Sequence, residues 1–328
     1  MKNSAIKKLV LVTGGTGFVG THVIIQLLQQ GFTVRTTIRS VNKKNQVIET
    51  LTRAGIVSFD NLSFIEADLN KDENWNEAVK DCSYVLHVAS PFQLEEPKDE
   101  NELIAPARDG VLRILRAARD AAVKRVVLTS SFGAIGYSID PVNHIFTEAD
   151  WTDSNKPVGA YIKSKTIAEK AAWDFMVTEG GELELTTINP VGIFGPALAN
   201  DYSVSIELIK DLLNGNMNKN YTTYSFGVVD VRDVAVLHIK AMLHPAAKGE
   251  RFLATADGAM TFYDVAELIK NERSEAAVKI EALDPVDKSS YIQLSNSKAK
   301  QVLDWSPITK EAAILASVDS LLNESLLK

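Results

Sequence analysis

The fold of this chain is decided near its start, by the stretch Val10-Leu11-Val12-Thr13-Gly14-Gly15-Thr16-Gly17-Phe18-Val19-Gly20. Its aliphatic run predicts a buried strand, and the glycines that follow predict a sharp turn into a helix. Gly14 permits a tight turn, Gly17 lets a pyrophosphate approach the backbone, and Gly20 lets helix and strand pack closely. Three glycines alone are also typical of an ordinary turn, but this strand–turn–helix setting indicates a dinucleotide site at the positive end of the helix.

Downstream of this stretch, short aliphatic runs alternate with longer amphipathic segments. Such alternation predicts right-handed β-α-β crossovers, and therefore an α/β fold with a Rossmann-like, doubly wound parallel sheet. The expected strands lie at 9–12, 33–38, 62–66, 84–88, 125–129 and 185–189, and the expected helices at 17–30, 46–54, 75–80, 103–121 and 160–178.

Beyond Pro190 the alternation weakens. We expect strands at 227–231 and 251–254, and helices at 206–213, 234–243, 261–271 and 298–303. We therefore predict a dinucleotide-binding Rossmann domain over 1–190, which carries the serine, tyrosine and lysine discussed below, and a smaller C-terminal substrate-binding lobe over 191–328, from which segments can return to the first domain. The segment 141–157, rich in Asp, Asn and Pro, is expected to be a loop near the cleft between them.

Composition excludes several classes of protein. The 328 residues carry 35 Lys and Arg against 42 Asp and Glu, a net charge of −7 without a basic block, which argues against binding nucleic acid or an anionic membrane. The single cysteine, Cys82, fits a reducing, cytoplasmic setting, and the chain start shows neither a signal peptide nor a membrane span. The five histidines are scattered without the spacing of metal ligands, so no metal site is predicted.

The second expected strand indicates which nucleotide binds. An NAD site places an Asp or Glu about 20 residues beyond the glycines, where it accepts hydrogen bonds from the ribose. Here that segment has no acid and carries Arg35 and Arg39, with Lys43 and Lys44 one turn further. Guanidinium and ammonium groups suit a 2′-phosphate, so NADPH/NADP⁺ is the predicted cofactor, and a solvated basic edge is the alternative. Asp68, which ends the third strand, is either a partner of the adenine or a helix N-cap.

A cluster of polar residues follows the fifth strand. Ser130 and Ser131 end that strand, and Tyr161 and Lys165 lie four residues apart on an expected helix, so phenol and ammonium share a face. A nearby cation stabilises a phenolate and lowers its pKa, which lets the pair move a proton to or from a substrate oxygen. A serine hydroxyl at the end of a strand can bind the same oxygen. Tyr-x-x-x-Lys alone occurs by chance in many helices, but together with the glycines and the serines it indicates catalysis.

These motifs, in this order, resemble those of the extended short-chain dehydrogenases/reductases. Within that family the chain is most similar to the branch of dihydroflavonol reductase, cinnamoyl-CoA reductase and the methylglyoxal/aldehyde reductases. The resemblance spans nearly the whole chain, through the glycines, Tyr161 and Lys165, and segments 68–69, 87–91, 129–131, 189–191, 229–235 and 295–300, with branch-specific detail at 34–43 and 168–173. One departure is Gly136, where some aldehyde reductases of the branch carry a bulky aromatic residue, so substrate preference does not carry over.

The resemblance implies roles for particular residues. Ser131, taken over Ser130 by motif position, would orient the carbonyl, and Tyr161 would donate the proton. Lys165 would lower the pKa of that phenol and hold the nicotinamide ribose. The other implied cofactor contacts are the loop residues Gly14, Thr16, Gly17, Phe18, Val19 and Gly20, the 2′-phosphate ligands Arg39 and Lys43, then Asp68, Leu69, Val88, Ala89, Ser90 and Tyr161, and Pro190 and Val191 against the nicotinamide.

The predicted function is the NADPH-dependent reduction of aldehydes or ketones, by a monomer or homodimer. A coarse placement gives a pocket wall of Phe92, Tyr137, Phe194 and Tyr202 without clustered cations, which favours a small uncharged substrate. One alternative is an NAD-dependent sugar-nucleotide epimerase or dehydratase, which Arg39 argues against. The other is a non-catalytic NADP-binding redox sensor, a type of relative that typically loses the Tyr or the Lys.

Overall fold

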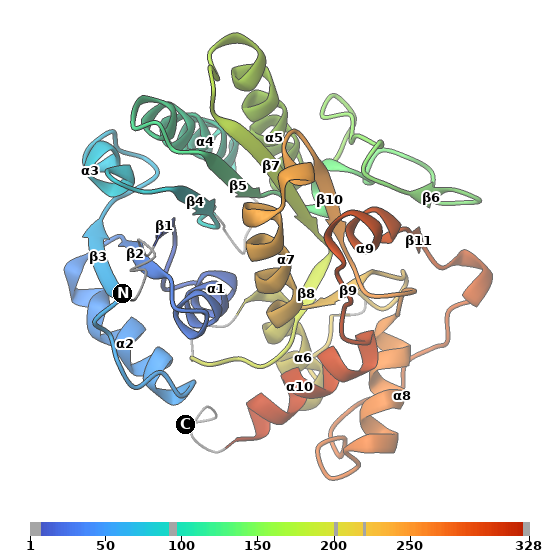
Figure 1. Ribbon diagram of the computed structural model, residues 1–328. Helices are drawn as coiled ribbons and strands as arrows, with labels where there is room; N and C mark the ends of the chain where they lie inside the picture. Colours follow the sequence, from blue (N-terminus) through green and yellow to red (C-terminus); the bar gives the residue numbers. More distant parts are fainter. Residues whose placement is uncertain (1–7, 92–96, 200–202, 219–220, 324–328) are drawn as a thin grey trace.

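The computed structural model describes residues 8–91, 97–199, 203–218 and 221–323. At its centre lies a seven-stranded sheet of order β10-β7-β5-β4-β1-β2-β3 (Figure 1). All of its neighbouring strands pair in parallel. The strands are β1 (Leu9–Val12), β2 (Thr33–Ile38), β3 (Leu62–Glu66), β4 (Tyr84–His87), β5 (Arg125–Thr129), β7 (Glu184–Pro190) and β10 (Arg251–Ala254). The strand order reverses direction between β1 and β4, which confirms the predicted doubly wound fold.

Helices cover both faces of this sheet. The α-helices of the described residues are α1 (Phe18–Gln29), α2 (Lys44–Arg53), α3 (Trp75–Val79), α4 (Asn101–Asp120), α5 (Ala160–Thr178), α6 (Val204–Asn214), α7 (Val231–Leu243), α8 (Phe262–Glu272), α9 (Ser297–Leu303) and α10 (Lys310–Leu322), of which α6, α8 and α10 lie beside the sheet rather than on its faces. Successive strand residues point to opposite faces, so Val10 and Val12 pack with α1, α2 and α7, and Leu11 packs with α3, α4 and α5. Within the described ranges, no helix has the length and apolar character needed to cross a membrane.

A smaller apolar core lies beside the sheet. It joins residues of α6, α8 and α10 with those of β8 (Gly192–Phe194) and β9 (Val228–Asp230), which form a two-stranded sheet. A second two-stranded sheet pairs β6 (Ile145–Phe146) with β11 (Gln293–Leu294). The chain does not stay in this smaller lobe after β8, because β10 joins the edge of the large sheet and α7 packs against α1.

The expected elements agree with the structure to within three residues at each boundary. Helix α10 was not expected, nor were the short strands β6, β8 and β11. Strand β6 falls within the segment 141–157 that we expected to be a loop. These short strands contain two or three residues each, too few to show a period in the sequence.

Candidate active site

The glycine-rich turn has the geometry of a nucleotide-binding loop. Gly14 has φ of +74°, in the left-handed region, and its Cα is so close to Ala89 that a Cβ would meet that residue at 3.1 Å. A Cβ on Gly20 would lie 2.2 Å from the carbonyl oxygen of Gly14, so only glycine fits. The first turn of α1 has no acidic residue, and its free N–H groups suit a pyrophosphate. The structure therefore places Gly14, Gly17 and Gly20 as the sequence predicts.

The loop is attached to the end of β4 through one hydroxyl. Thr13 Oγ1 accepts the backbone N–H groups of Val88 and Ala89, both at 3.0 Å, and lies 2.8 Å from His87 Nδ1. Because the Thr13 hydroxyl already accepts two hydrogen bonds, its own proton is donated in the third contact, to Nδ1 of His87. A neutral His87 ring with an accepting Nδ1 carries its proton on Nε2. Burial lowers the pKa of His87 to about 3, which keeps the ring neutral. Sequence reasoning missed Thr13 and His87 as members of the site.

A pocket extends from the glycine loop toward the smaller lobe. Thr16, Gly17 and Phe18 line it on one side, and residues 197–199, Ser203 and Ile206 line the other. Phe18 packs edge-on against His22 at 5.6 Å between ring centroids and contacts the core of the lobe. The predicted contacts Thr16, Phe18 and Val19 thus lie at the start of α1, where the two parts of the molecule meet.

The basic residues around β2 separate into two groups. Arg35 donates to the backbone carbonyls of Glu77, Ala78 and Lys80 at 2.8–3.0 Å, so it joins β2 to α3 and is not available to a phosphate. Lys44 lies over the ring of Phe64, 5.5 Å from its centroid. The Arg39 and Lys43 side chains are exposed and form no hydrogen bond or ion pair with any residue in the described ranges. Of the four basic residues, these two remain available for a 2′-phosphate.

The end of β3 carries two carboxylates that contact the backbone. Asp68 Oδ1 accepts the N–H of Asn70 at 2.9 Å, and Glu66 Oε2 accepts that of Val41 at 3.1 Å. Asp68 therefore closes a turn in the loop before α3, whose N-cap is Asn74, so the alternative interpretation of Asp68 as a helix N-cap is wrong, and its contact with adenine stays a prediction. Leu69, the next residue, packs against Gly110 of α4, whose Cβ would lie 3.1 Å from it.

Ser131, Tyr161 and Lys165 come together at the carboxyl ends of β5 and β7. Tyr161 and Lys165 lie on the first turns of α5, with Lys165 Nζ 5.8 Å from the centroid of the phenol ring. The Ser131 hydroxyl hydrogen-bonds to the Tyr161 phenol and accepts the N–H of Gly133 at 3.0 Å. Ser130 turns the other way, so the geometry favours Ser131 as the serine that faces the tyrosine.

Burial dominates the electrostatics of this cluster. It raises the pKa of Tyr161, an effect that the hydrogen bond from Ser131 partly offsets. Burial also lowers the pKa of Lys165 to about 8, and the negative charge of Glu169 opposes that change. The sequence led us to expect that Lys165 lowers the pKa of Tyr161. In the structure the pKa of Tyr161 is raised, because burial is the largest influence on it, and the lowering effect of Lys165 stays a prediction.

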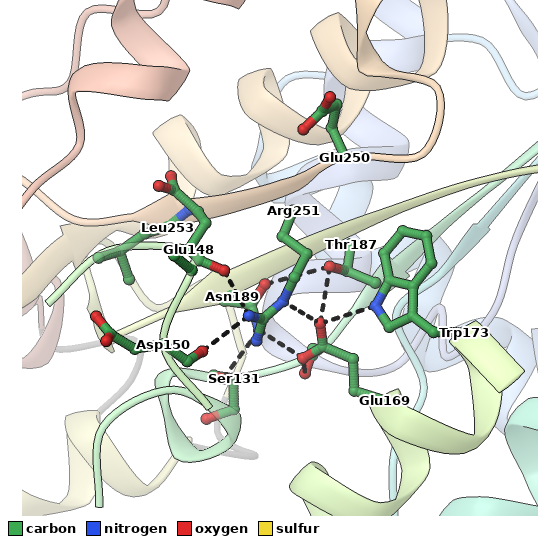
Figure 2. Close-up of polar contacts among 12 residues, drawn as sticks. Ser131, Glu148, Asp150, Glu169, Trp173, Thr187, Asn189, Glu250, Arg251 and Leu253 are labelled. Carbon is green, nitrogen blue, oxygen red and sulfur yellow. Dashed lines mark hydrogen bonds and ion pairs between the residues drawn. The ribbon is translucent and has the colours of Figure 1, made fainter. Parts of the chain in front are cut away.

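A buried polar network connects Ser131 and Asn189 with Glu169 and Arg251 (Figure 2). Its centre is Glu169, one turn beyond Lys165 on α5, which accepts from Ser130 Oγ at 2.5 Å and from Asn189 Nδ2 at 2.6 Å. Arg251 Nε on β10 donates to the same carboxylate at 2.7 Å. Sequence reasoning did not assign a role to Glu169, although the Lys165-to-Glu169 spacing repeats the four-residue step between Tyr161 and Lys165.

The nicotinamide contacts predicted at the end of β7 lie beside this network. Pro190 is buried as the last residue of β7, and the N–H of Val191 donates to Ala254 O at 3.2 Å. Both therefore sit at the same edge of the sheet as Ser131. Their contact with a nicotinamide ring stays a prediction.

The predicted substrate pocket is only partly described. Tyr137 is 58% exposed as a residue, and the pKa of its phenol is raised first by burial of the phenol and then by the nearby Tyr161 phenol. The Tyr224 phenol lies nearby, and its pKa is raised to about 12 by burial and then by Tyr137 and Tyr221. Phe194 lies in the interior of the smaller lobe, 2% exposed and stacked on Phe226, rather than at a surface open to a ligand. Phe92 and Tyr202 lie outside the described residues.

Gly136 shows why its side of the pocket differs from that of some relatives. A Cβ at this position would lie 2.3 Å from the ring of Phe132, so that ring occupies the space of a Gly136 side chain. Phe132 is held there by Phe146, with ring centroids 5.4 Å apart.

In the part of the chain that the structure describes, no group of three or more His, Cys, Asp or Glu side chains could hold a metal ion.

Comparison with known proteins places this site in a family. The family model described as "NAD dependent epimerase/dehydratase family" matches residues 10–254. A cinnamoyl-CoA reductase of Medicago truncatula is 31% identical, with 98% of each chain covered. A putative NADPH-dependent methylglyoxal reductase of Candida albicans is 30% identical over 95% of this chain and 98% of its own.

Solved structures agree with these relatives. The yeast methylglyoxal/isovaleraldehyde reductase, crystallised in complex with NADPH, superposes with a TM-score of 0.85 at 27% identity, over 97% of this chain and 99% of that one. The chain therefore belongs to the NAD dependent epimerase/dehydratase family of extended short-chain dehydrogenases/reductases, in the branch of NADPH-dependent reductases that includes the cinnamoyl-CoA, dihydroflavonol and methylglyoxal reductases.

Proposed function

We propose that this protein is an NADPH-dependent reductase that converts a small uncharged aldehyde or ketone to the alcohol. The observation that carries the proposal is the Ser131, Tyr161 and Lys165 cluster, which lies at the same sheet edge as the glycine loop. When bound, NADPH supplies the hydride that adds to the carbonyl carbon. Arg39 and Lys43 would hold its 2′-phosphate, and Lys165 its nicotinamide ribose.

The protein's own residues then handle the carbonyl oxygen. The Ser131 hydroxyl orients this oxygen toward Tyr161, whose phenol gives it a proton as negative charge develops there. A raised pKa suits this direction of the reaction, because Tyr161 stays protonated at neutral pH until the substrate takes the proton. The charged Lys165 beside the ring stabilises the phenolate that remains.

The surroundings of Tyr161 support an uncharged substrate. Tyr137 presents a phenol near the catalytic hydroxyl, and Tyr224 presents a second phenol near that of Tyr137, so both offer apolar surface and neutral hydrogen-bonding groups. A substrate charge buried there without a partner would cost several kcal/mol. We therefore expect simple aldehydes and ketones to be turned over more efficiently than carboxylated or nucleotide-linked ones.

A turnover assay with matched substrates tests the proposal. The protein is mixed with NADPH and with pairs of uncharged and carboxylated aldehydes or ketones, and the loss of NADPH absorbance is followed. In parallel, UDP- and CDP-sugars with NAD are analysed by chromatography, and NADPH binding is measured by calorimetry. Turnover of uncharged carbonyls is expected. Conversion of a nucleotide sugar without activity on carbonyls would identify an epimerase or dehydratase, and NADPH binding without any turnover would identify a sensor.

Assembly and location belong to the same proposal. We propose a monomer or homodimer, which light scattering coupled to size-exclusion chromatography distinguishes. The apolar residues of α4 and α5 pack toward the sheet, and outward-facing residues of these helices form ion pairs such as Lys163 with Glu100, which supports the monomer. The one cysteine, Cys82, is buried, and we propose the cytoplasm as the site of action.

A further inference from the structure

A buried carboxylate lies one helical turn below the catalytic lysine. The Glu169 side chain has no solvent exposure, and it projects from α5 into the space between α5 and strands β5, β7 and β10. A buried carboxylate is costly unless charge and hydrogen bonds compensate it fully. The contacts of Glu169 therefore show which groups compensate its buried charge.

Both oxygens of Glu169 are occupied by donors (Figure 2). Oε1 accepts from Arg251 Nε at 2.7 Å, Thr187 Oγ1 at 3.0 Å and Trp173 Nε1 at 3.3 Å, and Oε2 accepts from Ser130 Oγ and Asn189 Nδ2. Asn189 Nδ2 also donates to the backbone oxygen of Ser131 at 3.2 Å. The carboxylate is thus linked, through one amide, to the residue whose hydroxyl faces Tyr161.

Arg251 is itself held in place from several directions. Its Nη1 donates to the backbone oxygens of Glu148 and Asp150 at 2.6 and 2.9 Å, and its guanidinium lies 3.6 Å from the centroid of the Trp151 ring. A cation fixed in this way compensates the buried charge of Glu169 and prevents the carboxylate from turning away.

Glu169 and Lys165 also face a common cavity. The cavity is lined by His87 from β4, Ser130 from β5, and Ala107 and Val111 from α4. Among the described residues of this wall, Glu169 carries the only carboxylate, and the one other titratable group besides Lys165 is His87, whose pKa is lowered by burial and then by the charge of Lys165. Burial drives the pKa of Lys165 down to about 8, and the charge of Glu169 limits that fall.

We propose that Glu169 is a positioning residue, which keeps the Lys165 ammonium charged beneath Tyr161 and fixes the strand end that carries Ser131. This inference rests on the proposed function, because it assigns Glu169 an effect on catalysis through Lys165. It predicts that the charge of the carboxylate matters separately from its role in packing.

The test compares two buried Arg–Glu pairs. Glu169→Gln keeps the shape of the side chain and removes its charge, and Glu184→Gln does the same where Glu184 pairs with the buried Arg125 at 2.6 Å, at the opposite ends of β5 and β7. The measurement is kcat/KM for carbonyl reduction between pH 6 and 10, with unfolding followed by circular dichroism.

In the wild type, kcat/KM is expected to fall at alkaline pH as Lys165 loses its proton. In the Glu169→Gln variant we expect this fall to begin at a pH lower by about half a pH unit or more, because the charge that favours the ammonium has been removed. The Glu184→Gln variant should be less stable to unfolding, and its kcat/KM should fall at the same alkaline pH as that of the wild type. If Glu169→Gln does not fold, the double variant Glu169→Gln, Arg251→Met removes the uncompensated cation as well and should show the same shift.

Two outcomes overturn the proposal: a folded variant whose alkaline limb matches that of the wild type, or failure of both variants to fold, which assigns Glu169 a purely structural role. Failure of the proposed function is distinct, because the wild-type protein itself would then show no Tyr161-dependent reduction of any carbonyl.

Discussion

The two ends of the cofactor groove are built in opposite ways. At the reaction end, formed by Ser131, Tyr161 and Lys165, Lys165 is only 8% exposed and a buried network lies directly beneath it. At the phosphate end, formed by Arg39 and Lys43, both side chains are exposed and bind no described residue. One end is fixed before any ligand arrives, and the other leaves its charges free for the ligand.

This difference separates chemistry from cofactor choice. Buried charges interact strongly, because little water screens them, and their protonation depends on their surroundings. Exposed charges are screened by salt over about 10 Å at 0.1 M ionic strength. We therefore expect catalysis to respond to pH and little to salt, and the choice between NADPH and NADH to respond to salt. The predictions below test that separation.

The largest effect is expected at the reaction end. Tyr161→Phe removes one hydroxyl, and the loss of a general acid should lower kcat by roughly 10²–10⁴-fold while the affinity for NADPH is kept. Tyr263→Phe is the matched control, since it removes a phenol on α8 of the smaller lobe. Steady-state kinetics and calorimetry measure both quantities. A Tyr161→Phe variant with more than about half of the wild-type kcat would exclude Tyr161 as the donor.

The next effect is expected at the phosphate end. Arg39→Asp with Lys43→Ala replaces two cations by a carboxylate that repels the 2′-phosphate and accepts from the ribose hydroxyls. Two charge-assisted hydrogen bonds favour NADPH by roughly 10²–10⁴-fold, and screening places the value near the lower limit. The double variant should prefer NADH, judged by kcat/KM for both cofactors. Lys44→Ala, which only removes a contact with Phe64, should leave the preference unchanged. A wild type that already prefers NADH contradicts the assignment.

A tenfold effect is expected from pH. The active form of Lys165 is charged, and its pKa is about 8, so activity is complete below that value and is lost as the pH rises through it. In the reductive direction kcat/KM should fall by about tenfold per unit above pH 8. Lys165→Arg stays charged over this range and should remove the decline, whatever its absolute rate. An unchanged decline in that variant would assign the titration to another group.

The smallest effect is expected from salt. Raising the ionic strength from about 0.05 to 0.5 M should increase KM for NADPH by a few-fold and leave kcat unchanged, because the screened charges lie at the phosphate end. The Arg39→Asp, Lys43→Ala variant should show a flat response for NADH. A salt effect on kcat of similar size would show that the two ends are not independent.

Sequence alone predicted the sheet well, because its buried strands are continuous aliphatic runs. The bounds of β1, β2, β3, β5 and β10 match the prediction residue for residue. Helix α10 was missed although its buried positions repeat with helical spacing and Thr309 caps it by accepting the N–H of Ala312. Apolar residues also lie on its other face, at Ala312, Leu315 and Leu322, so no one-sided hydrophobic pattern reveals the helix.

The site was predictable where its residues are close in sequence. Tyr161 and Lys165 are four residues apart, and helical spacing places them together. Glu169 depends on Arg251, 82 residues away, and only the tertiary fold brings that cation to it. Arg35 and Arg39 look equivalent in sequence, yet the packing of α3 occupies Arg35 and leaves Arg39 free. Phe194 was expected in the pocket because the sequence does not show which residues of the smaller lobe face the sheet and which lie in the interior of the lobe.

The return of the chain to the sheet at β10 affects how this protein is made. During synthesis the glycine loop, Tyr161 and Lys165 all leave the ribosome before residue 251, but until β10 follows them the edge of β7 has no partner strand. Glu169 lacks its counter-charge over the same interval. A nascent chain at this stage presents an open strand edge, which is a template for aggregation and a target for chaperones. A truncated product ending near residue 190 would therefore carry most of the site residues and still lack a stable site.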